Sequence, residues 1–138
     1  MYDSNLHTII LLEIYFKGIF LLKNMKRIEA MVPTLRRTSV VETILEAGAK
    51  GVTVSENRGK GSGKRSLVRG SRGTAQFIAD YNRIDTISTM VNDSQVDDIV
   101  SSILKTAYRG NEGDGMIFVS TIDEAYHIGT GNKISSLD

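Results

Sequence analysis

Residues 25–55 carry the pattern that decides the predicted fold: MKRIEAMVPTLRRTSVVETILEAGAKGVTVS. At the start of this stretch, Ile28, Ala30 and Val32 alternate with residues of the opposite face, which is typical of a strand with one buried side. Pro33 ends the pattern, because proline has no N–H to donate to a sheet. The stretch therefore opens with a half-buried strand.

A helix and a second strand complete the unit. Ser39 stands three residues before Glu42, which matches a capping box and predicts a helix start there. Gly48 follows the apolar positions of this helix and predicts its end. Val52 and Val54 then alternate with polar residues, as in a second strand.

The next segment is strongly basic. Residues 58–73, RGKGSGKRSLVRGSRG, hold six of the 17 Lys and Arg and no acid, whereas the rest of the chain has 11 bases against 16 acids. Five glycines and the absence of periodicity predict a long loop, and loops of this length are usually functional or disordered. Its candidate partner-binding residues are Arg58, Lys60, Lys64, Arg65, Arg69 and Arg72.

The second half of the chain repeats the unit. A third strand is expected over about 83–91, a helix starting at Ser94 with Asp97 and ending at Gly110, and a fourth strand over 116–122. A short fifth strand is expected over about 125–128, and the tail that follows it is expected to be loose.

The predicted fold class is α+β. Two split units of this kind form a ferredoxin-like βαββαβ domain, with an antiparallel sheet and both helices on one face. The long loop then joins strands 2 and 3. The second face of the sheet has no cover within one chain, so symmetric association of several copies is expected.

The first 24 residues form a separate extension. Its apolar run at 9–22, IILLEIYFKGIFLL, is interrupted by Glu13, Lys17 and Gly18, whereas a membrane-spanning helix needs about 20 apolar residues. Three interpretations stay open. Translation starts at Met25 and the extension is a gene-model artefact; or the extension is a helix that binds a partner or a membrane surface; or, least favoured, it spans a membrane.

Composition excludes several classes of function. The 138 residues suit one domain, and the absence of Cys excludes disulfides and thiol nucleophiles. His7 and His127 are far apart in the sequence, which argues against a His-rich metal site and against Ser-His-Asp catalysis. We therefore expect no resident metal and no enzymatic activity. The net charge of +1 implies no general attraction to nucleic acid.

Three motifs in order resemble the PII signal-transduction family. Residues 25–55 resemble the family's opening, GDGMIFV at 113–119 resembles its GDGKIFV signature, and HIGTGN at 127–132 occupies the place of its closing stretch. The resemblance covers about 25–138. It implies a cytoplasmic homotrimer that regulates nitrogen metabolism and controls a target enzyme or transporter through a T-loop, here about 58–80.

The resemblance also implies an effector site between subunits that binds ATP or ADP. On this chain the site falls on Gly51, Val52, Thr53, Gly59, Gly61, Gly113, Asp114, Gly115, Met116 and His127. Two glycines around an aspartate let backbone N–H groups cradle an anion such as a phosphate, although GDG alone also fits a plain tight turn.

The chain departs from the family at its phosphate-binding cations. Met116 replaces a lysine, and His127 and Gly129 replace two arginines. Charge-assisted contacts are worth about 1.5–3 kcal/mol each, so three losses would remove most affinity for ATP. Either loop cations such as Lys60 replace them, or the effector is ADP, AMP or another small anion; we favour the second explanation.

Two further family features are lost. The glutamine that helps to hold magnesium and 2-oxoglutarate falls near Gly63 or Lys64, so binding of both is doubtful. The tyrosine that some members modify falls near Gln76 or Phe77, so nucleotidylylation there is not expected.

The runner-up function is a nucleic-acid-binding module that uses the Gly/Arg-rich loop. Against it, the loop has no aromatic residue between Arg58 and Gly73 on which bases could stack. A third class, a metal-tolerance or structural trimer, is weakened by the absence of Cys and the scarcity of His.

Overall fold

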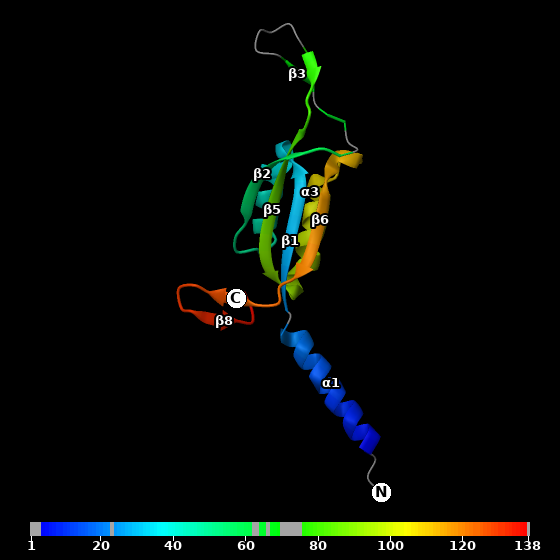
Figure 1. Ribbon diagram of the computed structural model, residues 1–138, viewed down its shortest axis with the longest axis vertical. Helices are drawn as coiled ribbons and strands as arrows, with labels where there is room; N and C mark the ends of the chain where they lie inside the picture. Colours follow the sequence, from blue (N-terminus) through cyan, green and yellow to red (C-terminus); the bar gives the residue numbers. More distant parts are fainter. Residues whose placement is uncertain (1–3, 23, 62–63, 66, 70–75, 138) are drawn as a thin grey trace.

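The computed structural model describes residues 4–22, 24–61, 64–65, 67–69 and 76–137 (Figure 1). The helices are α1 Ser4–Leu22, α2 Arg37–Glu46 and α3 Val96–Ala107, with 3₁₀ turns η1 Thr34–Arg36, η2 Asp93–Gln95 and η3 Glu112–Asp114. The strands are β1 Met25–Pro33, β2 Thr53–Gly59, β3 Leu67–Arg69, β4 Gln76–Ile78, β5 Asn82–Asn92, β6 Met116–Thr121, β7 Ala125–His127 and β8 Asn132–Ile134.

Four strands form the main sheet in the order β2-β5-β1-β6. Each neighbouring pair is antiparallel; Ala30 of β1, for example, pairs with Ile87 of β5 and with Ile117 of β6. Helices α2 and α3 cover one face (Figure 1). This confirms the predicted ferredoxin-like α+β fold, with β2 and β6 as the two edge strands.

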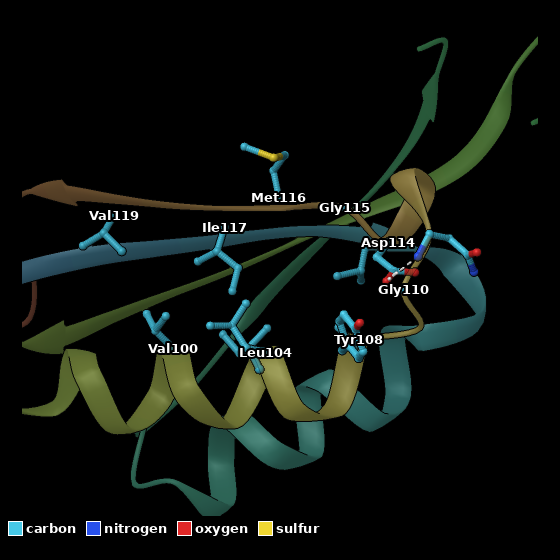
Figure 2. Close-up of a pocket in the computed structure, with 13 residues that line it drawn as sticks. Val100, Leu104, Tyr108, Gly110, Asp114, Gly115, Met116, Ile117 and Val119 are labelled. Atoms are coloured by element: carbon cyan, nitrogen blue, oxygen red, sulfur yellow. Dashed lines mark hydrogen bonds between the residues drawn. The ribbon is translucent and has the colours of Figure 1, made fainter. Parts of the chain in front are cut away.

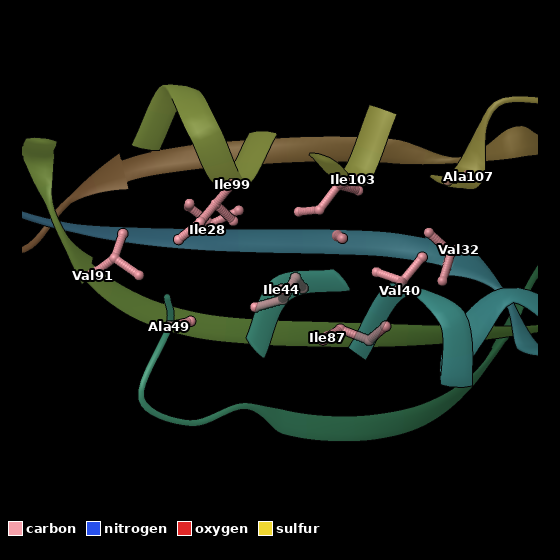
Figure 3. Close-up of a cluster of buried hydrophobic side chains, with 11 residues drawn as sticks. Ile28, Val32, Val40, Ile44, Ala49, Ile87, Val91, Ile99, Ile103 and Ala107 are labelled. Atoms are coloured by element: carbon pink, nitrogen blue, oxygen red, sulfur yellow. The ribbon is translucent and has the colours of Figure 1, made fainter. Parts of the chain in front are cut away.

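The core lies between the sheet and the two helices (Figure 3). Period-2 alternation in β1 and β5 directs every second side chain inward, and the apolar stripe of α3 packs against them. The buried cluster consists of Ile28, Ala30, Val32, Val40, Ile44, Ala49, Ile87, Val91, Ile99, Ile103 and Ala107.

The second face of the sheet is uncovered and partly apolar. Met31, Met90, Met116 and Phe118 are 37–60% exposed there, and Met31 pairs directly with Met116 across β1 and β6. This is the bare face that the sequence predicts.

Two helix starts differ from the sequence-based prediction. Helix α2 begins at Arg37, and Ser39 does not cap it: the Ser39 hydroxyl donates to the Arg36 carbonyl at 3.0 Å. Before α3, the capping box is formed by Asn92 and Gln95 around η2 rather than by Ser94 and Asp97. A 3₁₀ turn precedes each helix, and such a turn shifts the start by a few residues from the position that a motif predicts.

The loop and the tail contain more structure than the sequence predicts. Strand β2 continues through Gly59, two residues into the predicted loop, and β3 pairs with β4 inside it. In the tail, for which the sequence predicts a loose segment, β8 pairs with β7 in a short hairpin. Backbone pairing needs no apolar periodicity, which explains why the sequence pattern does not reveal these strands.

Helix α1 extends away from the sheet (Figure 1). Its described apolar side chains between Leu6 and Tyr15 are 47–64% exposed. None of the helices in the described part of the chain combines the length and apolarity that a membrane crossing requires.

Candidate functional site

The GDG turn lies between α3 and β6. The Asp114 carboxylate accepts hydrogen bonds from the backbone N–H groups of Arg109 at 2.7 Å and Asn111 at 3.3 Å. Gly115 has a φ of +109°, and a Cβ at this position would collide with the Met31 carbonyl oxygen of β1. The turn is thus built by its own backbone and by its close approach to β1.

These hydrogen bonds lower the pKa of Asp114 below its ordinary value of 3.8. The Arg109 N–H has the largest effect, partial burial opposes it, and the N–H groups of Asn111 and Gly110 add to it. The positive charge of Arg36 lowers the pKa further. Arg36 is thus a cation whose charge acts on this turn and which the sequence analysis did not identify.

An apolar groove of about 710 Å³ lies beside the turn, between α3 and β6. Figure 2 shows Val100 and Leu104 of α3 facing Ile117 of β6. The Met116 side chain points to the opposite side of the sheet, toward the bare face. The lining residues are Val32, Val100, Ile103, Leu104, Ala107, Tyr108, Gly110, Asn111, Asp114, Gly115, Met116, Ile117 and Val119.

The second predicted part of the effector site lies on the opposite edge of the sheet. Residues 51–53 lead into β2, where the Thr89 hydroxyl donates to the Gly51 carbonyl at 2.7 Å. Two strands, β5 and β1, separate β2 from β6. A single chain therefore does not bring Gly51, Val52 and Thr53 together with Gly113, Asp114 and Gly115.

His127 is also remote from the GDG turn within one chain. It lies in the β7–β8 hairpin, next to the end of the sheet from which β1 starts (Figure 1), whereas Met116 pairs with the last part of β1. The His127 Nδ1 atom accepts from the Thr130 N–H at 3.2 Å, and the neighbouring Ile128 is 98% exposed. The hairpin tip is thus free to reach another molecule.

Arg58 and Gly59 form the end of β2, and the other loop residues follow it. At Gly59 a Cβ would collide with the Ile84 side chain, so glycine lets β2 and β5 pair closely here. Gly61, Lys64 and Arg65 are exposed. Lys60 lies over the Tyr81 ring, 5.7 Å from its centroid. The Arg69 backbone belongs to β3, and Arg72 lies outside the described residues.

A charge cluster around the buried Asp85 was missed by the sequence analysis. Asp85 is 1% exposed; it accepts hydrogen bonds from Arg37 Nη1 at 3.1 Å and from the Thr34 hydroxyl at 3.1 Å. Arg37 Nη1 also bonds Glu56 of β2 at 2.8 Å. An aspartate at an inward position of an otherwise apolar strand pattern was the available signal.

In the described part of the chain, no three His, Cys, Asp or Glu side chains are grouped as metal ligands. The expectation that no metal is resident stays a prediction.

The structure combines a ferredoxin-like domain, a glycine-flanked turn between α3 and β6, and a basic loop with a projecting hairpin. The family model "Nitrogen regulatory protein P-II" matches residues 25–132. The chain belongs to this family, whose members are signal-transduction regulators.

Curated relatives and solved structures agree. The chain is 36% identical over 111 residues to the nitrogen regulatory protein P-II of Azospirillum brasilense, covering 79% of this chain and 96% of the relative. It is 38% identical over 109 residues to that of Mesorhizobium japonicum, covering 78% and 94%. A citrate-bound PII of Arabidopsis thaliana superposes with a TM-score of 0.61 at 25% identity, covering 80% of this chain and 89% of the other. B. subtilis GlnK, at 19% identity, shares the fold with a TM-score of 0.61, covering 81% and 96%.

Proposed function

We propose that this protein is a homotrimeric, non-enzymatic regulator of nitrogen metabolism. It binds an anionic effector in clefts between subunits and controls a target enzyme or transporter through the loop at 58–80. Within the cell it acts in the cytoplasm. The observation that carries this proposal is the division of the candidate site between the two edge strands, in a chain that belongs to the P-II family.

Division of the site between edges requires more than one copy. Residues 51–53 on the β2 edge and 113–115 on the β6 edge become neighbours only when the β2 edge of one copy meets the β6 edge of the next. Such a head-to-tail contact closes into a ring. It also covers the exposed Met31 and Phe118 of the bare face, which supports a trimer with the sheets turned inward.

The residues present fit a small anion with fewer charges than ATP. The donors that we propose for the anion are the N–H groups of the GDG turn that neither the Asp114 carboxylate nor the Asn111 carbonyl engages, together with the Arg36 cation, whose charge acts on this turn. Met116 and Gly129 supply no charge where the family has cations. Binding of citrate by the Arabidopsis relative supports an anionic effector that is not a nucleotide. We therefore rank ADP, AMP and small carboxylates above ATP, and we expect no requirement for magnesium or 2-oxoglutarate.

The test is calorimetric titration with ATP, ADP, AMP and citrate, each with and without magnesium and 2-oxoglutarate. Analytical ultracentrifugation measures the assembly in the same samples. We expect a trimer that binds one of these anions at one per subunit. A monomer, or a trimer that binds none of them, would contradict the proposal.

Mixing two variants tests whether the site is shared. A Cβ at Gly51 or at Gly113 would meet open space, so Gly51→Asp and Gly113→Asp place repelling carboxylates on opposite edges without steric conflict. Each variant alone is expected to lose binding. After the two are unfolded and refolded together, roughly one cleft in four receives two unaltered edges, and binding returns in that proportion. No recovery would place the whole site within one chain.

A further inference from the structure

The β3–β4 hairpin carries exposed apolar side chains at its described positions. It projects beyond the end of the sheet, away from α2 and α3 (Figure 1). Leu67 pairs with Ile78, so these two side chains share one face, and the backbone of Arg69 pairs with that of Gln76. Phe77 lies on the other face.

Three apolar side chains of this hairpin are largely exposed to solvent. Leu67 is 71% exposed, Phe77 53% and Ile78 59%. A two-stranded hairpin alone is marginally stable in water, and a third strand or a packed layer makes it stable. Strands β3 and β4 form a sheet of their own, separate from the main sheet. The outward-facing edge of each strand therefore presents backbone N–H and C=O groups to which a further strand can pair.

The base of the hairpin is fastened to the domain. The Asn82 side chain donates to the Lys64 carbonyl at 3.1 Å, and the Lys60 ammonium lies over the Tyr81 ring. On β2 and β5, the Asn57 side chain donates to the Thr86 hydroxyl at 3.0 Å. These contacts place the hairpin on a defined stalk.

The surroundings of the hairpin are cationic. Arg58, Lys60, Lys64 and Arg65 are exposed, and residues 58–73 contain no acid. The rest of the chain carries an excess of acids. A partner that docks here gains from negative charge and from an apolar stripe at the same time.

We propose that the β3–β4 hairpin binds an extended, acidic segment of a partner protein, which adds to it as a third strand. Alternate apolar residues of that segment pack on Leu67 and Ile78, and its acids face Lys64 and Arg65. This inference rests on the proposed function, because it specifies the target that the loop contacts. Strand addition supplies affinity through backbone hydrogen bonds and specificity through alternate side chains.

An acidic peptide fits these observations better than RNA does. Base stacking uses exposed aromatic faces; the exposed Phe77 lies on the face opposite Leu67 and Ile78, and the Lys60 ammonium lies over one side of the Tyr81 ring. Leu67 and Ile78 form an aliphatic pair, which suits Val or Leu rather than a base.

The experiment measures binding of a fluorescent eight-residue peptide of alternating Glu and Val to the full chain without added effector. We expect the double variant Lys64→Glu/Arg65→Glu and the double variant Leu67→Ser/Ile78→Ser each to weaken binding at least tenfold. The matched controls are Lys105→Glu on α3 and Leu45→Ser on α2, which change an exposed cation and an exposed leucine elsewhere and leave binding unchanged.

Three comparison ligands decide between mechanisms. Octaglutamate that binds as tightly as the alternating peptide would overturn the apolar contact. An N-methylated peptide that binds equally well would overturn strand addition. Tighter binding of octauridylate would replace the proposal with nucleic-acid binding.

Circular dichroism and ultracentrifugation of each variant show that fold and assembly are intact. Effector titration is measured separately from peptide binding. If the hairpin binds no peptide, the strand-addition proposal fails while the trimer and effector proposals stand. If the effector proposal fails, the peptide measurement still tests strand addition.

Discussion

Asp85 is an acidic residue in an environment that acidic residues rarely occupy. Its carboxylate is buried in the apolar layer between the sheet and α2, and it depends on Arg37 and Thr34 for hydrogen bonds. Removal of one partner from a buried ion pair leaves an uncompensated charge, which costs more than the pair itself contributes.

We predict that Arg37→Met lowers the free energy of unfolding by about 3 kcal/mol, the lower end of the range for a broken buried pair, because the Arg37 side chain is 35% exposed. The control is Lys133→Met, which breaks the exposed pair between Lys133 and Glu124 and costs less than about 1 kcal/mol. Urea unfolding followed by circular dichroism measures both. Equal losses would show that Asp85 does not depend on Arg37.

Asp114 makes stability depend on pH. Its pKa is lower in the folded protein than the ordinary value of 3.8, so the unfolded chain binds its proton more readily. The stabilisation is complete above pH 3.8 and is lost as the pH falls through the lowered pKa. We predict that the stability difference between the wild type and Asp114→Asn is constant near neutral pH and shrinks below pH 3.8. Urea unfolding across this range measures it; a constant difference would refute the assignment.

At the scale of elements, the junction of η3 with β6 lies so close to the backbone of β1 that it has no room for a side chain. Gly115 combines a φ of +109° with close approach to the Met31 carbonyl, so β6 can pair with β1 only if a glycine stands there.

Gly115→Ala is therefore expected to destabilise the protein by about 2–4 kcal/mol, from the left-handed backbone and the collision together. The matched control is Gly113→Ala in the same turn, where a Cβ meets open space; its cost is expected to be within about 0.5 kcal/mol of zero. Urea unfolding of the two variants compares them directly. If both variants lose the same small amount of unfolding free energy, β6 can move away from β1 at little cost in stability.

The elements also differ in how well their boundaries could be predicted. The alternation in β1 and β5 and the apolar stripe of α3 depend on burial, so their positions follow from sequence. The helix starts depend on local hydrogen bonds: Gln95 and Ser39 both match capping motifs, but only Gln95 forms a reciprocal box, with Asn92. Sequence spacing does not distinguish a motif that forms from one that does not.

At the scale of the whole molecule, the division into an N-terminal extension and a domain stays a prediction. The apolar side chains of α1 between Leu6 and Tyr15 stay exposed, whereas Met25 at the start of β1 is 1% exposed. The family model also begins at residue 25.

We predict that a chain of residues 25–138 folds with the same melting temperature as the full chain, within about 2 °C, because the described apolar side chains of α1 are exposed rather than packed on the domain. Differential scanning calorimetry of the two chains measures this. A fall of more than about 5 °C would show that α1 packs on the domain. The control is Met25→Ala, which opens a cavity at the end of the sheet. This variant is expected to lower the melting temperature by more than about 5 °C, which shows that the measurement detects a loss of packing.

The sequence by itself determined the fold class and the family, because alternation, helical periodicity and glycine turns are local properties of residues 25–55 and 113–119. The tertiary structure decided what no local pattern contains. It placed residues 51–53 and 113–115 on opposite edges of one sheet, and it brought Arg37 to the buried Asp85. Each of these depends on contacts between segments distant in sequence, which arise only when the helices pack on the sheet.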